Sequence, residues 1–114
     1  VARTYFGLTS DNQLRIMITR IVRMVFQEDK TTQFEQVFDE SKEKIRARSG
    51  CNYLSLHKDH HQSNTYYTLS IWDSQQDLDD YRDSELFKTT WAKTKILFAD
   101  KPKAYSLEQL VELP

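Results

Sequence analysis

The sequence predicts an α+β fold in which a four-stranded antiparallel sheet carries two helices on one of its faces. Three observations support this class. Strand-like and helix-like patterns follow one another in the order β-α-β-β-α-β. Both helical segments begin with the spacing of a capping box, over residues 32–35 and 74–77. The length of 114 residues, of which 39% are hydrophobic, suits one domain.

The first strand is predicted over residues 17–26, where β-branched and apolar side chains dominate. Such a run is typical of a strand buried on both faces, which requires a layer on each side of the sheet. Arg20 and Arg23 interrupt it. The first helix is expected over residues 32–48, with Gly50 as a helix stop. Its apolar face is formed by Phe34, Val37, Phe38, Ser41 and Ile45.

The second and third strands form a predicted hairpin over residues 51–58 and 65–72, joined by the polar segment 59–64. Side chains alternate between the two faces of a strand. On the second strand, Tyr53, Ser55 and His57 therefore share one face. On the third strand, aromatic and hydroxyl side chains share a face, which holds Tyr66, Thr68, Ser70 and Trp72.

The second helix is expected to begin after Ser74, to be interrupted at Asp83 and Ser84, and to end at Pro102. Its apolar stripe continues through Phe87, Thr90, Trp91, Thr94, Leu97 and Phe98. A last strand is predicted from the alternation of Tyr105, Leu107, Val111 and Leu113. The completed order is that of a ferredoxin-like fold, with both helices on one face of the sheet.

The face of the sheet without helices is predicted to carry Tyr66, Trp72 and Tyr53. Large aromatic side chains are poorly suited to full exposure. Pairing two sheets face to face would bury them, and a two-fold dimer is the commonest arrangement. We therefore expect a homodimer formed through the open sheet face, with a pocket enclosed between the copies.

Composition narrows the classes of partner. The net charge of −1 gives no electrostatic case for binding nucleic acid or a membrane surface. Cys51 is the chain's one cysteine, and no signal-peptide core is evident, so we expect a cytoplasmic protein. Residues 1–16 are interpreted as an N-terminal extension before a domain spanning residues 17–114. The extension is either a loose arm or an arm that packs on a partner subunit.

Three stretches resemble one known family. Residues 50–57 resemble the entry to its second strand, and residues 67–74 resemble its third strand and the tryptophan that ends it. The spacing of Leu78, Tyr81, Ser84 and Phe87 is similar to that of its broken helix. The family is that of the antibiotic biosynthesis monooxygenases, and the resemblance covers roughly residues 17–113. It implies a dimeric α+β barrel.

This family includes cofactor-free oxygenases of polycyclic aromatic phenols, in which the ionised substrate itself supplies electrons to dioxygen. The resemblance implies a monooxygenase that acts on a small aromatic or quinone-like molecule and uses no cofactor. Two alternatives stay open: a non-catalytic module that binds a small molecule, and a dimer without a cavity. The family's haem-degrading branch uses a first-strand asparagine and a second-helix histidine. Those positions fall near Val22 and Trp91, which disfavours haem degradation.

Candidate catalytic residues are Trp72, at the family's tryptophan position, Tyr66 as a hydrogen-bonding group, and His57 as a base. Trp72 is equally consistent with filling of the dimer core, and His57 with a surface or interface histidine. Candidate substrate-binding residues are Arg20, Val22, Met24, Tyr53, Ser55, Thr68, Ser70, Phe87 and Trp91. The alternative interpretation of Arg20 is a structural ion pair with an acidic residue such as Glu108, and that of Trp91 is packing in the core. No metal site is expected from the histidines, because no ligand cluster accompanies them.

Overall fold

Four strands form one antiparallel sheet, in the order β4 (Cys51–Lys58), β5 (Thr65–Trp72), β3 (Ile18–Val25) and β6 (Lys103–Leu107). The computed structural model describes residues 6–8 and 14–114, with side chains described from residue 16 onward. The elements are β1 (Phe6–Leu8), β2 (Leu14–Ile16), β3 (Ile18–Val25), the 3₁₀ turn η1 (Glu28–Lys30), α1 (Thr31–Arg46), β4 (Cys51–Lys58), β5 (Thr65–Trp72), α2 (Gln75–Arg82), α3 (Glu85–Lys95) and β6 (Lys103–Leu107).

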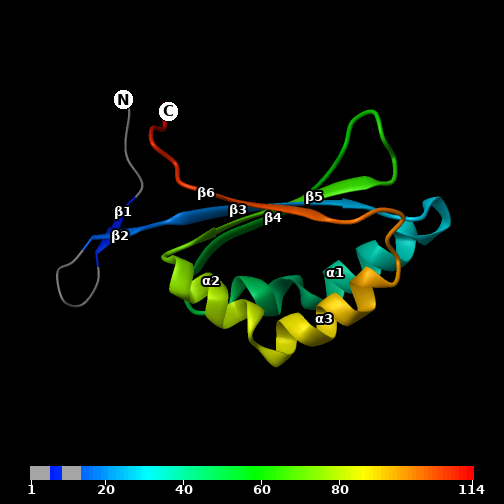
Figure 1. Ribbon diagram of the computed structural model, residues 1–114, viewed down its shortest axis with the longest axis horizontal. Helices are drawn as coiled ribbons and strands as arrows, with labels where there is room; N and C mark the ends of the chain where they lie inside the picture. The colour runs from blue at the N-terminus through cyan, green and yellow to red at the C-terminus, as the bar shows by residue number, and fades with distance from the viewer. Residues whose placement is uncertain (1–5, 9–13) are drawn as a thin grey trace.

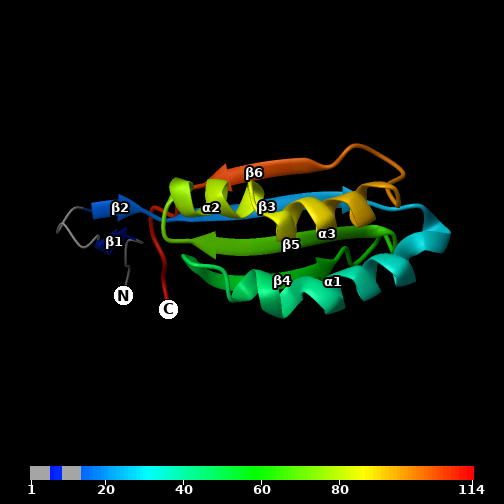
Figure 2. The same ribbon diagram turned by 90° about the horizontal axis from the view of Figure 1, so that it is seen from below.

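All three α-helices lie on the same side of the sheet, and the opposite side is uncovered (Figure 1). Viewed from the helical side, α1 lies along β4, while α2 and α3 follow one another over β3 and β5 (Figure 2). This arrangement confirms the predicted ferredoxin-like α+β fold. The strands β1 and β2 form a separate antiparallel pair that projects from one end of the sheet (Figure 1). They lie within the predicted extension of residues 1–16, whose boundary stays a prediction.

The start of α1 differs from the prediction. The helix begins at Thr31, and its N-cap residue Lys30 makes no side-chain capping hydrogen bond. Thr32 therefore lies inside the first turn, and the predicted capping box at residues 32–35 is wrong. The turn η1 leads directly into α1, so the chain is already wound when it reaches Thr32. At the other end, Gly50 has a φ of 83°, in the left-handed region that favours glycine after a helix.

The break between α2 and α3 agrees with the prediction. The Ser74 hydroxyl accepts a hydrogen bond from the Asp77 backbone N–H at 3.2 Å and donates to the Asp77 carboxylate at 2.8 Å. The Ser84 hydroxyl accepts from the Phe87 N–H at 3.2 Å and so caps α3. Each serine satisfies an N–H that its helix leaves unpaired.

The C-terminal boundaries were predicted too far along the chain. The helix α3 ends at Lys95, well before Pro102, because the Leu97 N–H turns back to the Thr94 carbonyl. The strand β6 ends at Leu107 and does not extend to Leu113. Leu107 pairs with Thr19, next to the first residue of β3, so the neighbouring strand offers β6 little further to pair with.

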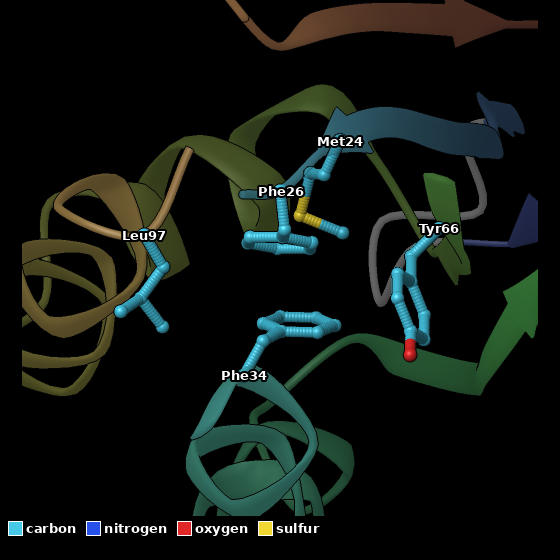
Figure 3. Packing of buried hydrophobic residues seen from close by; sticks show 5 residues of the cluster. All are labelled: Met24, Phe26, Phe34, Tyr66 and Leu97. Carbon is cyan, nitrogen blue, oxygen red and sulfur yellow. The ribbon is translucent and has the colours of Figure 1, made fainter. Parts of the chain in front are cut away.

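The core lies between the sheet and the helices, in two clusters. In the first, Met24, Phe26, Phe34, Tyr66 and Leu97 surround one another, and Phe34 from α1 stacks on Phe26 (Figure 3). Their ring centroids are 4.1 Å apart. The second cluster joins the far end of the sheet to α2 and consists of Ile18, Cys51, Trp72 and Leu78.

Tyr66 and Trp72 were predicted on the open face, and that prediction is wrong. Trp72 is 0% exposed and Tyr66 is 2% exposed, both on the helical side. Strand pairing explains the difference. Tyr66 lies opposite Met24, and directly paired residues point to the same face. Thr68 and Ser70 lie between Tyr66 and Trp72 at a spacing of two residues, so they also face the helices.

The open face carries the other set of β5 side chains, Tyr67, Leu69 and Ile71. Tyr53 lies opposite Ile71 and is 45% exposed, so its predicted place on the open face is confirmed. From β6, Tyr105 and Leu107 add further exposed apolar surface to the same face. No helix in the described part of the chain has the length and apolar character needed to cross a membrane.

Candidate functional site

A cavity of about 340 Å³ lies between the helical side of the sheet and the three helices. Its volume falls at the lower end of the range for small-molecule sites. The sheet contributes Arg20, Val22, Met24, Leu54, Thr68, Ser70, Trp72 and Ala104. The helices contribute Phe34, Val37, Phe38, Ser41, Ile45, Leu78, Tyr81, Arg82, Phe87, Thr90, Trp91 and Thr94, and Pro102 completes the lining.

A run of aromatic rings forms one wall of the cavity. Trp72 stacks on Tyr81 with ring centroids 5.0 Å apart, and Phe87 meets the edge of Tyr81 at 5.3 Å. Trp91 stacks on Phe87 at 5.7 Å and a tilt of 11°. Such contacts hold each ring in one orientation and contribute beyond simple burial. The wall consists of two stacked pairs set nearly perpendicular to each other, because the Tyr81 and Phe87 planes meet at 83°, and it offers an aromatic ligand both ring faces and ring edges.

Hydroxyl groups in the lining differ in what they offer a ligand. Ser41 donates to the Val37 carbonyl at 3.0 Å, and Thr94 donates to the Thr90 carbonyl at 2.8 Å. Their protons are therefore taken by their own helices. Ser70 is different, because its oxygen accepts from the Trp72 indole N–H at 2.9 Å. A serine hydroxyl that accepts one bond keeps its own proton to donate.

Two arginines also line the cavity, Arg20 from β3 and Arg82 from the end of α2. Burial lowers the pKa of Arg20, the positive charge of Arg82 lowers it further, and the carboxylate of Asp79 acts in the opposite direction. Arg20 donates to the Ser106 hydroxyl at 2.9 Å. The structure therefore places it beside Ser106 and not in the predicted alternative, an ion pair with Glu108.

Tyr81 supplies a hydroxyl that stays protonated at neutral pH. Burial raises its pKa to about 12, with a further rise from the nearby Cys51 and an opposing effect of Arg48. A neutral phenol of this kind donates a hydrogen bond and does not act as a base. Ser70 thus brings a donor hydroxyl to the cavity lining, and Tyr81 belongs to the same lining.

The structure brings most of the predicted site residues together. The cavity lining includes Arg20, Val22, Met24, Thr68, Ser70, Trp72, Phe87 and Trp91. It lies under the helices within one chain, whereas the sequence placed the pocket on the open face. The indole N–H of Trp72 is engaged by Ser70 and its ring is 0% exposed, so Trp72 supports the wall through its stacking on Tyr81.

Four predicted residues lie elsewhere. The Tyr66 hydroxyl donates to the Glu35 carboxylate at 2.5 Å, and burial raises its pKa to about 12. Tyr66 therefore belongs to the core beneath α1. His57, Ser55 and Tyr53 lie on the open face, where Ser55 and His57 share a hydrogen bond of 2.8 Å. These four do not line the cavity.

Sequence reasoning missed Tyr81 and Arg82 as site residues. The signal was present, because Leu78, Tyr81 and Arg82 have the i, i+3, i+4 spacing of one helix face. A charged residue at the edge of such a face looks like part of the solvated surface until the helix is placed over the sheet. Within residues 16–114, no three histidine, cysteine or acidic side chains are close enough to hold a metal ion.

Comparison with known proteins adds the family. Residues 17–93 match the profile of the family described as antibiotic biosynthesis monooxygenase. A Caulobacter crescentus protein provisionally named an antibiotic biosynthesis monooxygenase is similar in structure, with a TM-score of 0.80 at 23% identity, over 84% of this chain and 92% of that one. No curated protein matches the chain significantly.

Two further solved structures show the same fold. A Nitrosomonas europaea protein, also provisionally named an antibiotic biosynthesis monooxygenase, has a TM-score of 0.80 at 14% identity, over 84% of this chain and 92% of that one. A conserved protein from Methanosarcina mazei has a TM-score of 0.79 at 14% identity, over 82% and 93%. At these identities the likeness establishes the fold alone.

Proposed function

The chain belongs to the antibiotic biosynthesis monooxygenase family, and from that premise we propose that it is a cofactor-independent monooxygenase of a small aromatic or quinol-like substrate. The observation that carries the proposal is the cavity of about 340 Å³ with its wall of stacked rings. A planar substrate would pack against such rings through its faces and edges. The reaction proposed needs a site that holds the substrate, and a largely apolar cavity supplies one.

The proposed chemistry uses the substrate's own electrons. An ionised anthrone-type carbon gives its electron pair to dioxygen, and a C–O bond forms. Protonation yields a hydroperoxide, which loses water as its O–O bond and the remaining C–H bond break. One oxygen atom ends in the new carbonyl and the other in water, so no external reductant is needed. The protein has to bind the ring system and stabilise the negative charge on oxygen.

Ser70 and Tyr81 are the residues proposed to stabilise that charge. Ser70 keeps its hydroxyl proton because the indole of Trp72 donates to its oxygen. Tyr81 is held in its neutral, donating form. Hydrogen-bond donors positioned before the reaction stabilise a developing oxyanion without reorganisation at the moment of reaction. Trp72 then acts as a positioning residue that holds Ser70 in its accepting orientation.

Binding without turnover is the second candidate, and one observation favours it. The described lining contains no carboxylate and no imidazole. A substrate that must lose a proton inside the cavity would therefore find no base with an ordinary pKa near neutrality. The oxygenase proposal accordingly requires a substrate acidic enough to ionise in water.

The open sheet face supports a proposal about assembly. Tyr53, Tyr105 and Leu107 are each close to half exposed there, and no helix covers them. Apolar surface of this kind on a small domain marks an interaction site. We propose that two copies pair through this face. Sedimentation velocity tests the pairing, and a Tyr105→Lys variant is expected to shift a dimer to monomer. A monomeric wild-type protein would contradict it.

Oxygen consumption with a panel of anthrones and quinols tests the enzyme proposal. Ser70→Ala is expected to lower kcat about 100-fold, as for the loss of one oxyanion donor. Ser63→Ala, in the exposed turn between β4 and β5, is the matched control and is expected to leave kcat unchanged. Ligands that raise Tm but are never consumed would favour the binding module, and equal rates in the two serine variants would remove the proposed role of Ser70.

A further inference from the structure

The two arginines in the cavity lining stand out because the rest of the lining is aromatic, aliphatic or neutral polar. We propose that Arg20 and Arg82 together form an anion-binding end of the cavity, which selects aromatic ligands that carry an ionised oxygen. The inference rests on the proposed function in using the same cavity. It goes further by naming the charge of the ligand and the residues that recognise this charge.

Arg20 has unused hydrogen-bonding capacity. It lies on β3 between Ser70 of β5 and Ser106 of β6, and it donates to the neutral hydroxyl of Ser106. A guanidinium has five N–H donors in a fixed fork that matches a carboxylate. Among the described residues, neither Arg20 nor Arg82 forms an ion pair. Donors on a partly buried cation are therefore left for a ligand.

The electrostatics of the pair favour an anion. Burial and the charge of Arg82 both disfavour the protonated form of Arg20. An arginine nevertheless stays charged in a protein, so the two like charges persist at neutral pH. Asp79 is the acidic group that acts on Arg20, and its carboxylate already accepts from Gln75 at 2.9 Å. A ligand anion between the guanidiniums would relieve their repulsion and replace hydration lost on burial.

The chain as a whole does not attract anions, because its net charge is −1. The positive charge is local to one part of a cavity with aromatic walls. A simple inorganic anion would leave those walls unfilled, and a neutral polycycle would leave the guanidiniums unpaired. A ring system bearing a carboxylate or a phenolate satisfies both. This also agrees with the lack of a base in the described lining, because such a ligand enters already ionised.

Tryptophan fluorescence provides a direct readout, since the chain's two tryptophans, Trp72 and Trp91, both line the cavity. Anthraquinone-2-carboxylate and the neutral anthraquinone-2-methanol are titrated against the full chain. A second arm uses 2-hydroxyanthraquinone, whose visible absorbance reports ionisation, and so separates phenolate from carboxylate recognition. The variants are Arg20→Gln and Arg82→Gln, with Lys88→Gln as the control from the exposed surface of α3.

The carboxylate is expected to bind about tenfold more tightly than the alcohol, as one charged hydrogen bond would give. Each arginine variant is expected to lose about tenfold in carboxylate affinity, with the alcohol unchanged within about twofold and Lys88→Gln without effect. The wild-type protein is expected to lower the bound phenol's pKa by about one unit. If the carboxylate binds more tightly than the alcohol but the pKa of the bound phenol is unchanged, the site recognises carboxylates and not phenolates.

Equal affinities for acid and alcohol in the wild-type protein would overturn the proposal. Arginine variants that weaken the binding of both ligands alike would overturn it too. Arg82→Gln keeps the test valid if Arg20→Gln does not fold, because Arg82 is exposed at the end of α2. These results are independent of turnover. Charge selectivity without oxygen consumption would contradict the oxygenase proposal and support the anion site. Oxygen consumption without charge selectivity would contradict the anion site and support the oxygenase.

Discussion

Replacing Trp72 with phenylalanine tests how the cavity wall is held. Trp72 is 0% exposed, stacks on Tyr81 and donates its indole N–H to Ser70. The smaller ring leaves unfilled volume in the core, at a cost of about 1–3 kcal/mol. Loss of the hydrogen bond adds about 1 kcal/mol. We therefore expect Trp72→Phe to lower the free energy of unfolding by about 2–4 kcal/mol, a large share of a domain's stability.

Urea denaturation followed by circular dichroism measures this change, and the double-mutant cycle with Ser70→Ala isolates the hydrogen bond. The expected coupling between the two positions is about 1 kcal/mol. Tyr53→Phe, on the exposed face, serves as the aromatic control and is expected to stay within about 0.5 kcal/mol of wild type. A Trp72→Phe cost as small as that of the control, or a coupling of zero, would refute the reasoning.

Three other predictions concern local structure. Gly50→Ala combines a φ of 83° with an added Cβ only 2.4 Å from Asp77 Cγ. The free energy of unfolding should therefore fall by at least about 1 kcal/mol, seen as a lower urea midpoint, and an unchanged midpoint would contradict this. Ser74→Ala should cost about 1 kcal/mol in thermal melts, whereas Thr32→Ala, which caps nothing, should cost less than half of that. The folded-state pKa of Tyr81, about 12, exceeds its unfolded value of about 10. Its stabilising contribution is therefore complete below pH 10 and lost as pH rises towards 12, a loss that Tyr81→Phe should reduce in alkaline denaturation curves. Identical alkaline curves for the two proteins would exclude this linkage.

The order of strands and helices could be predicted because it depends on local periodicity. The face of the sheet that each residue occupies could not. In β5, the set containing Tyr66 and Trp72 and the set containing Leu69 and Ile71 are both apolar, and alternation alone does not say which set meets the helices. Pairing with β3 decides it, because Met24 and Tyr66 lie opposite each other and share a face.

The strand β4 added a second difficulty. A register irregularity between Cys51 and Tyr53 separates the buried thiol from the strand residues that follow. Tyr53 consequently faces the open side, as predicted, whereas Trp72, predicted on the same face, lies on the helical side. The candidate ligand-binding residues on β3 and β5 were nevertheless largely those that line the cavity, because the family resemblance pointed to the same strands. Arg82 was missed, since its role depends on where α2 crosses the sheet.

The central claim is that the cavity between sheet and helices is the binding site. Isotope-labelled protein titrated with anthraquinone-2-carboxylate tests it in one nuclear magnetic resonance experiment. The indole N–H signals of Trp72 and Trp91 are expected to shift, together with the backbone amides of Thr68 and Ala104. Shifts confined to the open face, around Tyr53, Leu69 and Tyr105, with both indole signals unmoved, would contradict the account.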